Sequence, residues 1–281
     1  MNDDPTDGGW FERVDRNDPE SARDAIESGR VDAPADWPAR AVAAGFAADE
    51  DDYYRLLHDA TVNAARRAVR DRERADDRQL VHSIRAMDDA ERTANELAER
   101  AAEWGGSLFD DVGSGLDAAR EIADREPTTP AEERAASFAA RAVDLADEAD
   151  ELRAFVERTA PAVAPNLSEM AGPVLAGRLV SLAGGLEALA KMPSGTVQVL
   201  GAEDALFAHL AGRAPSPKHG VIYVHEYVRG TREEDRGSAA RAFAGKLTLA
   251  ARVDHYSGTY RPSLHEKLRD RIETIRARAD S

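Results

Sequence analysis

The residues with the clearest chemical potential are basic groups in two neighbouring segments of the C-terminal half. Lys218 and His219 lie in the stretch PKHG and are predicted to be in a loop, because two prolines, Pro215 and Pro217, precede them. A basic loop is a suitable place for a contact with an anionic partner such as RNA. For His219, a structural role with satisfied hydrogen bonds explains the residue equally well. The loop therefore indicates a phosphate-binding site that needs support from a second element.

The second segment, residues 236–254, reads RGSAARAFAGKLTLAARVD and is predicted to be a helix. Its predicted buried face consists of Phe243, Leu247 and Ala250. Arg241 and Arg252 are eleven residues apart, about three helical turns, and therefore share a face. Arg236 begins the segment, and Lys246 borders the buried face, where its stem could also lie along apolar surface. A solvated face would explain any one arginine, but the group, in an acidic protein, favours contacts with RNA phosphates.

Motifs for catalysis or metal binding are not found in the sequence. It has no cysteine, no H-E-x-x-H pattern, no G-x-S-x-G motif and no phosphate loop ending in Gly-Lys-Ser/Thr. Gly113-Ser114-Gly115 has no flanking strand and is predicted to be a turn, and acid pairs such as Glu203-Asp204 are typical of solvated surface. We therefore expect a protein that is not an enzyme and holds no metal or cofactor. An enzyme with an unfamiliar site is the alternative.

Charge is unevenly distributed along the 281 residues. The formal net charge is −16, yet residues 161–281 hold 16 Lys and Arg against 13 Asp and Glu, a net of +3, which leaves −19 for residues 1–160. All four lysines lie in the basic part. The C-terminal part is thus the expected face for an anionic partner. The acidic, lysine-poor composition resembles that of proteins adapted to molar salt, although an ordinary acidic protein is also compatible with it.

Composition and the N-terminus indicate a helical, cytoplasmic protein. Hydrophobic residues make up 42% of the chain and aromatic residues only 6%, so alanine, leucine and valine must form most of the core. No apolar stretch approaches the roughly 18 residues of a membrane span, and the acidic first residues do not resemble a secretory signal.

Two long helices are predicted to form an antiparallel coiled coil. The first covers residues 76–104 and ends at Gly105-Gly106. Its narrow apolar stripe consists of Leu80, Ile84, Met87, Ala94, Leu97, Ala101 and Trp104. The second begins with Thr129 as N-cap, Pro130, and Glu132 completing a capping box. Its heptad seam consists of Ala135, Phe138, Ala142, Leu145, Ala149, Leu152 and Val156. Leu80, Ile84, Met87, Phe138, Leu145 and Leu152 are the predicted dimerisation residues, because such a seam can also serve a second copy. An ordinary two-helix hairpin is the alternative.

These observations divide the chain into four parts and predict a mainly α fold. Residues 1–75 are expected to form a small α or α/β module, with a helix from Asp51 to Arg74. The coiled coil takes up residues 76–160, and Pro161 and Pro165 mark its end. Residues 161–261 are expected to be a compact, all-helical domain. Residues 262–281 are expected to be a charged helix with little apolar content.

Several ordered motifs resemble those of the Nop-domain family. Residues 164–207, APNLSEMAGPVLAGRLVSLAGGLEALAKMPSGTVQVLGAEDALF, are similar to the opening of the Nop domain. The runs PKHGVIY and RGSAARAFAGKLTLAARVDHYSG are similar to its remainder. Upstream, DRQLVHSIRAMDDAERTANELAERAAEW resembles the first coiled-coil helix of the same proteins. The resemblance covers about residues 76–260, most of the chain.

The resemblance implies an archaeal scaffold protein of box C/D small ribonucleoproteins. Its expected partners are a kink-turn box C/D guide RNA, a kink-turn-binding ribosomal-protein-like subunit, fibrillarin and a second copy of the chain. Fibrillarin, not this protein, would use S-adenosylmethionine to methylate ribose 2′-hydroxyls of rRNA or tRNA. The positions that match basic or RNA-facing parts of the family pattern are Gly201, Ala202, Lys218, His219, Arg236, Arg241 and Lys246. Asp204 departs from the lysine common in the family, and the N-terminal domain is shorter than usual.

The predicted mechanism is positioning. A rigid scaffold that fixes a guide RNA and a methyltransferase at a set separation can raise a reaction rate without a catalytic side chain of its own. The alternative hypothesis is an adaptor that uses the coiled coil for protein partners and makes no direct RNA contact. The basic bias of the C-terminal part argues against that alternative.

Overall fold

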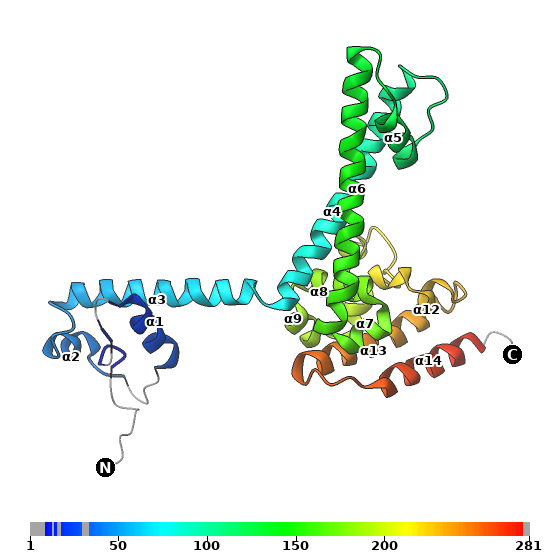
Figure 1. The fold of residues 1–281 in the computed structure, drawn as a ribbon. Coiled ribbons are helices and arrows are strands. Elements are labelled where there is room, and N and C mark those ends of the chain that lie inside the picture. The colour runs from blue at the N-terminus through cyan, green and yellow to red at the C-terminus, as the bar shows by residue number, and fades with distance from the viewer. Residues whose placement is uncertain (1–8, 13, 16–17, 30–33, 278–281) are drawn as a thin grey trace. The chain divides into compact units, whose positions relative to one another are not determined.

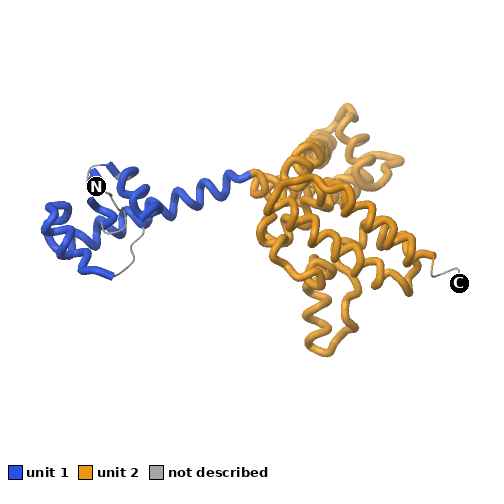
Figure 2. The backbone as a smooth tube through the Cα atoms, turned by 90° about the horizontal axis from the view of Figure 1, so that it is seen from below, with its two compact units in different colours: residues 1–75 blue, residues 76–281 orange. Residues whose placement is uncertain are grey.

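The computed structural model describes residues 9–12, 14–15, 18–29 and 34–277, and within them the chain is helical, with fourteen α helices, one 3-10 helix and no strand. The mainly α prediction is confirmed. The chain divides into two compact units, residues 1–75 and residues 76–281 (Figure 2). For the first unit, the described residues form helices, so the α form of the predicted module is the one observed.

The first unit is three helices around a small aromatic core. These helices are α1 (Pro19–Ser28), α2 (Trp37–Ala43) and α3 (Glu50–Glu73). The side chains of Asp18, Asp36 and Asp49 cap their N-termini, which satisfies backbone N–H groups that have no partner within the helix. Phe11, Phe46 and Tyr53 are buried together, and the indole of Trp10 donates a hydrogen bond to the Tyr53 hydroxyl (3.2 Å).

The second unit begins with a long helical hairpin. Helix α4 (Asp76–Gly106) runs beside α6 (Pro130–Val163), and the short α5 (Gly115–Asp124) packs against both (Figure 1). The predicted capping box is present, since the Thr129 hydroxyl accepts from the Glu132 backbone and the Glu132 carboxylate accepts from Thr129. Gly105 is needed near the end of α4, because a side chain there would meet Ile122 of α5.

The seam between α4 and α6 differs from the predicted heptad by one row. Ala135, Ala142, Ala149 and Val156 are buried as predicted. The second buried row, however, consists of Ala139, Ala146 and Ala160. Phe138, Leu145 and Leu152 are only half-buried. Small alanines allow the two backbones to approach closely, so the larger side chains are displaced to the flank of the hairpin.

Three of the predicted dimerisation residues have a different role. Leu80, Ile84 and Met87 are almost fully buried within the chain, against Val156 and Ala160. Helix α8 (Pro173–Ala183) covers them further, and a side chain at its Gly177 would lie only 2.9 Å from Ile84. These residues therefore form the junction between the hairpin and the rest of the second unit, and they are not available to a second copy.

Beyond the hairpin, short helices surround one central helix, α13 (Arg236–Tyr256). The remaining elements are α7 (Pro165–Ala171), α9 (Leu186–Lys191), α10 (Ser194–Val199), α11 (Glu203–Leu210), η1 (Val221–Val224), α12 (Glu226–Arg229) and α14 (Pro262–Ala277). Phe243, Leu247 and Ala250 are fully buried, as predicted. The core of this part is thus built around the inner face of α13.

The last helix, α14, buries more apolar side chains than predicted. On α14, Leu268, Ile272 and Ile275 are buried, and the helix packs on α13. Their spacing of four and three residues is helical, but charged neighbours hide it in the sequence. The helix is therefore part of the core and not a solvated tail.

Candidate nucleic-acid interface

Two glycines bring the predicted basic loop beside the loop that follows α10. Gly201 has a φ of +81°, a conformation that side chains strongly disfavour. At Gly220 a side chain would lie 2.0 Å from the Leu200 carbonyl oxygen, so only glycine fits. The Gly220 N–H donates to the Gln198 carbonyl (2.9 Å) and the Val221 N–H to that of Leu200 (2.8 Å). These contacts hold residues 198–202 against residues 218–221.

His219 and Arg236 converge on one tyrosine, and Lys218 lies beside His219 in the sequence. The His219 ring stacks on Tyr223, with centroids 4.5 Å apart, and the Arg236 guanidinium lies 5.6 Å from the centre of the same ring. Arg236 also donates to the Thr231 carbonyl (3.1 Å), and the Gln198 side chain donates to the Lys218 carbonyl (2.7 Å). We call Lys218, His219, Tyr223 and Arg236 the basic cluster. It presents two cations and a stacked ring pair, groups that suit a phosphate and a base.

Electrostatics keep the imidazole of this cluster neutral. Burial lowers the pKa of His219, and the positive charges of Arg236 and Lys218 lower it further. At neutral pH the ring therefore stacks on Tyr223 without adding a charge. The positive charge of the cluster comes from Lys218 and Arg236 alone.

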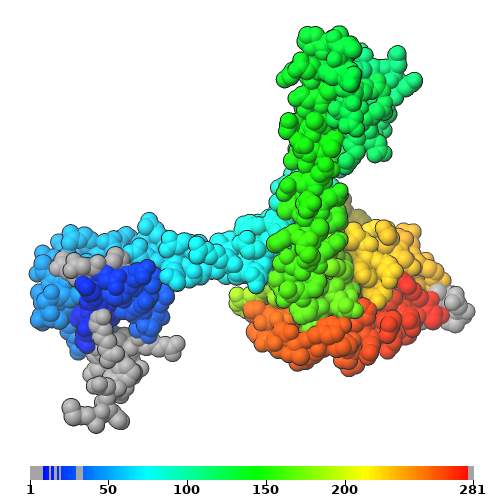
Figure 3. Space-filling model, in the orientation of Figure 1, coloured from blue at the N-terminus to red at the C-terminus, as the bar shows by residue number. Residues whose placement is uncertain are grey.

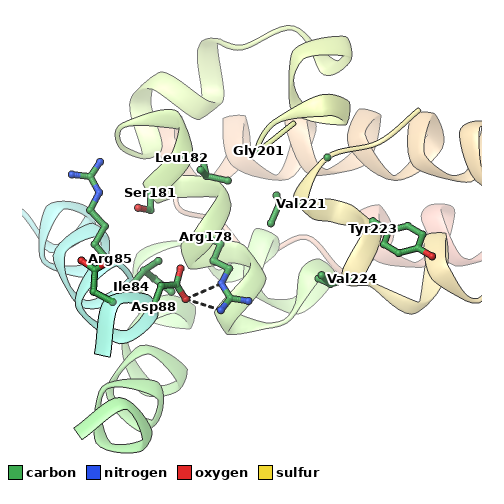
Figure 4. Close-up of a pocket in the computed structure, with 12 residues that line it drawn as sticks. Ile84, Arg85, Asp88, Arg178, Ser181, Leu182, Gly201, Val221, Tyr223 and Val224 are labelled. Atoms are coloured by element: carbon green, nitrogen blue, oxygen red, sulfur yellow. Dashed lines mark hydrogen bonds and ion pairs between the residues drawn. The ribbon is translucent and has the colours of Figure 1, made fainter. Parts of the chain in front are cut away.

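A groove adjoins the basic cluster. It has a volume of about 750 Å³ and lies between α4, α8 and residues 220–224 (Figure 4). Arg178 donates two hydrogen bonds to one carboxylate oxygen of Asp88 (2.6 and 3.2 Å) across it. Leu182 and Val224 line the groove with 47% and 49% of their surface exposed. Because Tyr223 lines the groove and belongs to the basic cluster, a ligand could contact both.

The other predicted residues are spread along α13 or beside it. Arg241 is exposed and Lys246 is half-buried, farther along the helix. Arg252 donates to the Ala190 carbonyl (3.0 Å) at the far end, about 24 Å along the axis from Arg236. The Gly201 N–H is bound to the Glu203 carboxylate (2.8 Å), and Ala202 is half-buried before α11. Of the eight predicted residues, Lys218, His219 and Arg236 thus belong to the basic cluster, Gly201 and Ala202 lie in the adjoining loop, and Arg241, Lys246 and Arg252 are spread along α13.

Residue-based reasoning missed several groups of this interface. Tyr223 stood within the quoted run PKHGVIY, but tyrosine spacing alone gave no reason to single it out. The groove needs α4 and α8 to come together, and the contacts that link them, such as the Arg178–Asp88 pair and the packing of Gly177 on Ile84, span about ninety residues of sequence. A local sequence pattern cannot predict a contact between residues so far apart in the sequence. Among the described residues, no group of three or more His, Cys, Asp or Glu side chains is placed to hold a metal ion.

Comparison with protein families gives one long match. The family model described as "Nop: snoRNA binding domain, fibrillarin" matches residues 77–276, which include the hairpin, the groove and the basic cluster. Within the part of the chain that the structure describes, no helix is both long and apolar enough to cross a membrane.

Individual relatives agree with that match. An uncharacterized NOP5 family protein of Methanocaldococcus jannaschii is 31% identical over 269 residues, which is 83% of this chain and 65% of that protein. Nucleolar protein 56 of Homo sapiens is 36% identical over 137 residues, 49% of this chain and 23% of that protein. This chain therefore spans less than two-thirds of either relative.

A solved structure shows the same fold. It is a crystal structure of a fibrillarin/Nop5p complex, and one of its chains aligns with a TM-score of 0.54 at 24% identity. The alignment covers 95% of this chain and 98% of that one.

Proposed function

The chain belongs to the Nop family, and from that premise we propose that it is a non-catalytic scaffold of a box C/D small ribonucleoprotein. In this proposal it binds a kink-turn guide RNA together with the kink-turn-binding ribosomal-protein-like subunit. It recruits fibrillarin, which methylates ribose 2′-hydroxyls with S-adenosylmethionine. The observation that carries the proposal is the basic cluster placed at the edge of the groove, since the pair offers adjoining surfaces for RNA and for protein.

The two surfaces suit the two halves of such a composite. Lys218 and Arg236 provide charge-assisted donors for phosphates, and the His219–Tyr223 pair provides aromatic faces for a base. The groove provides Leu182 and Val224 for apolar side chains, with the Arg178–Asp88 pair at its wall. Because each half alone offers a small contact area, we expect weak binding to RNA alone and tight binding to the composite.

Molar salt would strengthen the expected preference for the RNA-protein composite over RNA alone. In molar salt the Debye length is roughly 3 Å, so attraction over longer distances is weak. Binding would then depend on close contacts and on shape. A composite ligand that fills the groove and touches the basic cluster provides both.

Self-association fits the flank of the hairpin. Phe138, Leu145 and Leu152 form a half-exposed row on α6, and Phe155 beside it is 39% exposed. Trp104 of α4 stands near Phe138, with ring centroids 6.4 Å apart. Figure 3 shows α6, in green, uncovered along the visible face of the hairpin. We propose that this row contacts a second copy, which would place two guide sites on one particle.

The first unit is the proposed docking site for fibrillarin. Its aromatic core leaves Tyr54 half-exposed on α3, beside Tyr53 (ring centroids 5.4 Å apart). The relative of known structure was crystallised as a complex with fibrillarin. The reaction and its cofactor would belong to that partner.

A gel shift tests the proposal. A box C/D kink-turn RNA is titrated with the full chain at high salt, with and without the ribosomal-protein-like subunit. A supershift only in the presence of the subunit is expected. If no shift occurs in either arm, the RNA-binding function is wrong and a protein-only adaptor replaces it. The kink-turn protein alone, added to the chain without RNA, serves as the control for that second function.

A further inference from the structure

Exposed tyrosines gather at the C-terminal end of α13, far from the basic cluster. Tyr256 in its last turn is 68% exposed, and Tyr260 in the loop to α14 is 49% exposed. The orange segment that joins α13 to α14 lies at the surface in Figure 3. Single exposed apolar residues are common on proteins, so the two rings need support from the groups around them.

Basic residues lie near the C-terminal end of α13. Arg252 precedes Tyr256 by one helical turn, and its guanidinium is fixed by the Ala190 carbonyl (3.0 Å). Lys191, the residue after Ala190 at the end of α9, pairs with Glu187 (2.6 Å). The hydrogen bond and charge of Glu187 raise the pKa of Lys191, and the nearby Tyr256 phenol adds to that shift. Because Arg252 contacts the residue before Lys191, the end of α9 lies beside the last turns of α13.

A buried polar network holds the loop that carries Tyr260. The Asp254 carboxylate accepts from the Asn166 side chain (2.6 Å) and from the backbone N–H groups of Asn166 and Leu167 (3.0 and 2.9 Å). The Asn166 side chain in turn donates to the Thr259 carbonyl (2.9 Å) and accepts from the Arg261 N–H (2.6 Å). The backbone on both sides of Tyr260 is thus tied to the core.

This hydrogen-bond network orders the exposed loop before any ligand binds. Buried polar groups cost free energy unless each has a hydrogen-bond partner. The connected bonds of Asp254 and Asn166 meet this condition and make the loop rigid. Here it fixes the backbone of Thr259 and Arg261, on either side of Tyr260, in the loop that follows α13. A loop that is already ordered loses little conformational entropy when it binds a ligand.

We propose that Tyr256, Tyr260, Arg252, Arg261 and Lys191 form a second site, which binds single-stranded RNA. The two phenol rings stack on successive bases, and the arginines contact the phosphates between them. Glu187 neutralises Lys191 in part, so the arginines make the main ionic contacts. The site rests on the proposed function only in taking RNA as the partner. It is about 24 Å along α13 from the basic cluster, so it contacts a different stretch of RNA.

Fluorescence anisotropy with a labelled oligouridine and the full chain tests the site. The wild-type protein is expected to bind, and the double variant Tyr256→Ala/Tyr260→Ala is expected to bind at least about tenfold more weakly, as for stacked bases elsewhere. Tyr54→Ala, which removes an equally exposed tyrosine from the first unit, should leave the affinity unchanged. Lys267→Ala/Arg271→Ala, which removes two exposed cations from α14, should also leave it unchanged, because those residues lie outside the site.

Two results would overturn the site. One is a wild-type chain that does not bind oligouridine, and the other is a double variant that binds it as the wild type does. A failed supershift with the kink-turn composite, together with intact oligouridine binding, would reject the proposed function and keep this site. The reverse combination would reject this site and keep the proposed function.

Discussion

Single exposed cations carry much of the proposed interface. Lys218 and Arg241 are both exposed, whereas Arg236 is half-buried and also bound to the Thr231 carbonyl. Substituting the exposed pair therefore tests RNA contacts without disturbing the loop. Each charged hydrogen bond contributes about 1.5–3 kcal/mol, so Lys218→Ala/Arg241→Ala should weaken composite binding at least about tenfold in a gel shift.

A matched variant separates the effect of where the charges lie from the effect of the lost net charge. Lys267→Ala/Arg271→Ala removes two exposed cations from α14 and changes the net charge equally. It should bind the composite with unchanged affinity. Equal weakening in both double variants would show that net charge, and not the positions of Lys218 and Arg241, governs binding.

Another residue, His225, should make the stability of the second unit depend on pH. Its ring packs against Tyr227 and Phe243, with centroids 4.6 Å from each. Burial lowers the pKa of His225, and the charges of His265 and Arg276 act in the same direction while Glu226 opposes them. The unfolded chain therefore takes up the proton first as the pH falls below the ordinary value of about 6.5. The free energy of unfolding should decrease from about pH 7 downward until the folded ring is also protonated.

The variant His225→Asn tests this dependence. Asparagine can still accept the Tyr227 N–H at the start of α12, the bond that His225 makes now (3.2 Å). Denaturant unfolding at several pH values should give a flatter curve for the variant than for the wild type. Val224→Ala, a neighbour without a titrating group, should shift the curve without flattening it. Parallel curves for His225→Asn and wild type would contradict the assignment.

At the scale of elements, glycine positions decide how closely the loops approach. A side chain at Gly220 would overlap the Leu200 carbonyl, so Gly220→Ala must move residues 218–221 away from residues 198–202. We expect composite binding to fall more than tenfold while circular dichroism stays helical, because Lys218 and His219 lose their place. Gly237→Ala is the control, since its new methyl group would meet only the Cδ atom of Lys218 at 4.0 Å. Similar losses in both variants would count against the loop geometry.

The flank of α6 carries the prediction for self-association. Leu145→Asp places a charge in the half-exposed row, and burying it in a second copy would be costly. Light scattering should then report a smaller oligomer, with the helical content unchanged. Ser137→Asp adds the same charge at an exposed position of α6 and should leave the oligomer intact. An unchanged oligomer in Leu145→Asp would contradict the proposed self-association through α6.

Local sequence patterns predicted some helices and contacts and missed others, for physical reasons. Thr129, Pro130 and Glu132 define the start of α6 because a capping box acts within one turn. The buried role of Leu80, Ile84 and Met87 depends on α8, more than eighty residues away, and the stripe alone could not separate it from a subunit contact. Helix α5 was missed because Gly113-Ser114-Gly115 reads only as a turn, although Ser114 is the residue before its first turn. The basic cluster was found in part, since Lys218, His219 and Arg236 are local signals whereas Tyr223 joins them only in the fold.

At the scale of the whole molecule, the two units have separate cores. The aromatic core of Phe11, Phe46 and Tyr53 lies within residues 1–75, and the other buried clusters lie within residues 76–281. A protein of residues 76–281 should therefore fold by itself, since it loses none of its own core contacts. It should bind the kink-turn composite and self-associate as the full chain does, because the groove, the basic cluster and the row on α6 are all present. It should fail to support ribose methylation by added fibrillarin in a reconstituted assay, because the proposed docking unit is gone. The full chain measured beside it is the control, and methylation at the same rate by both would move the fibrillarin contact into the second unit.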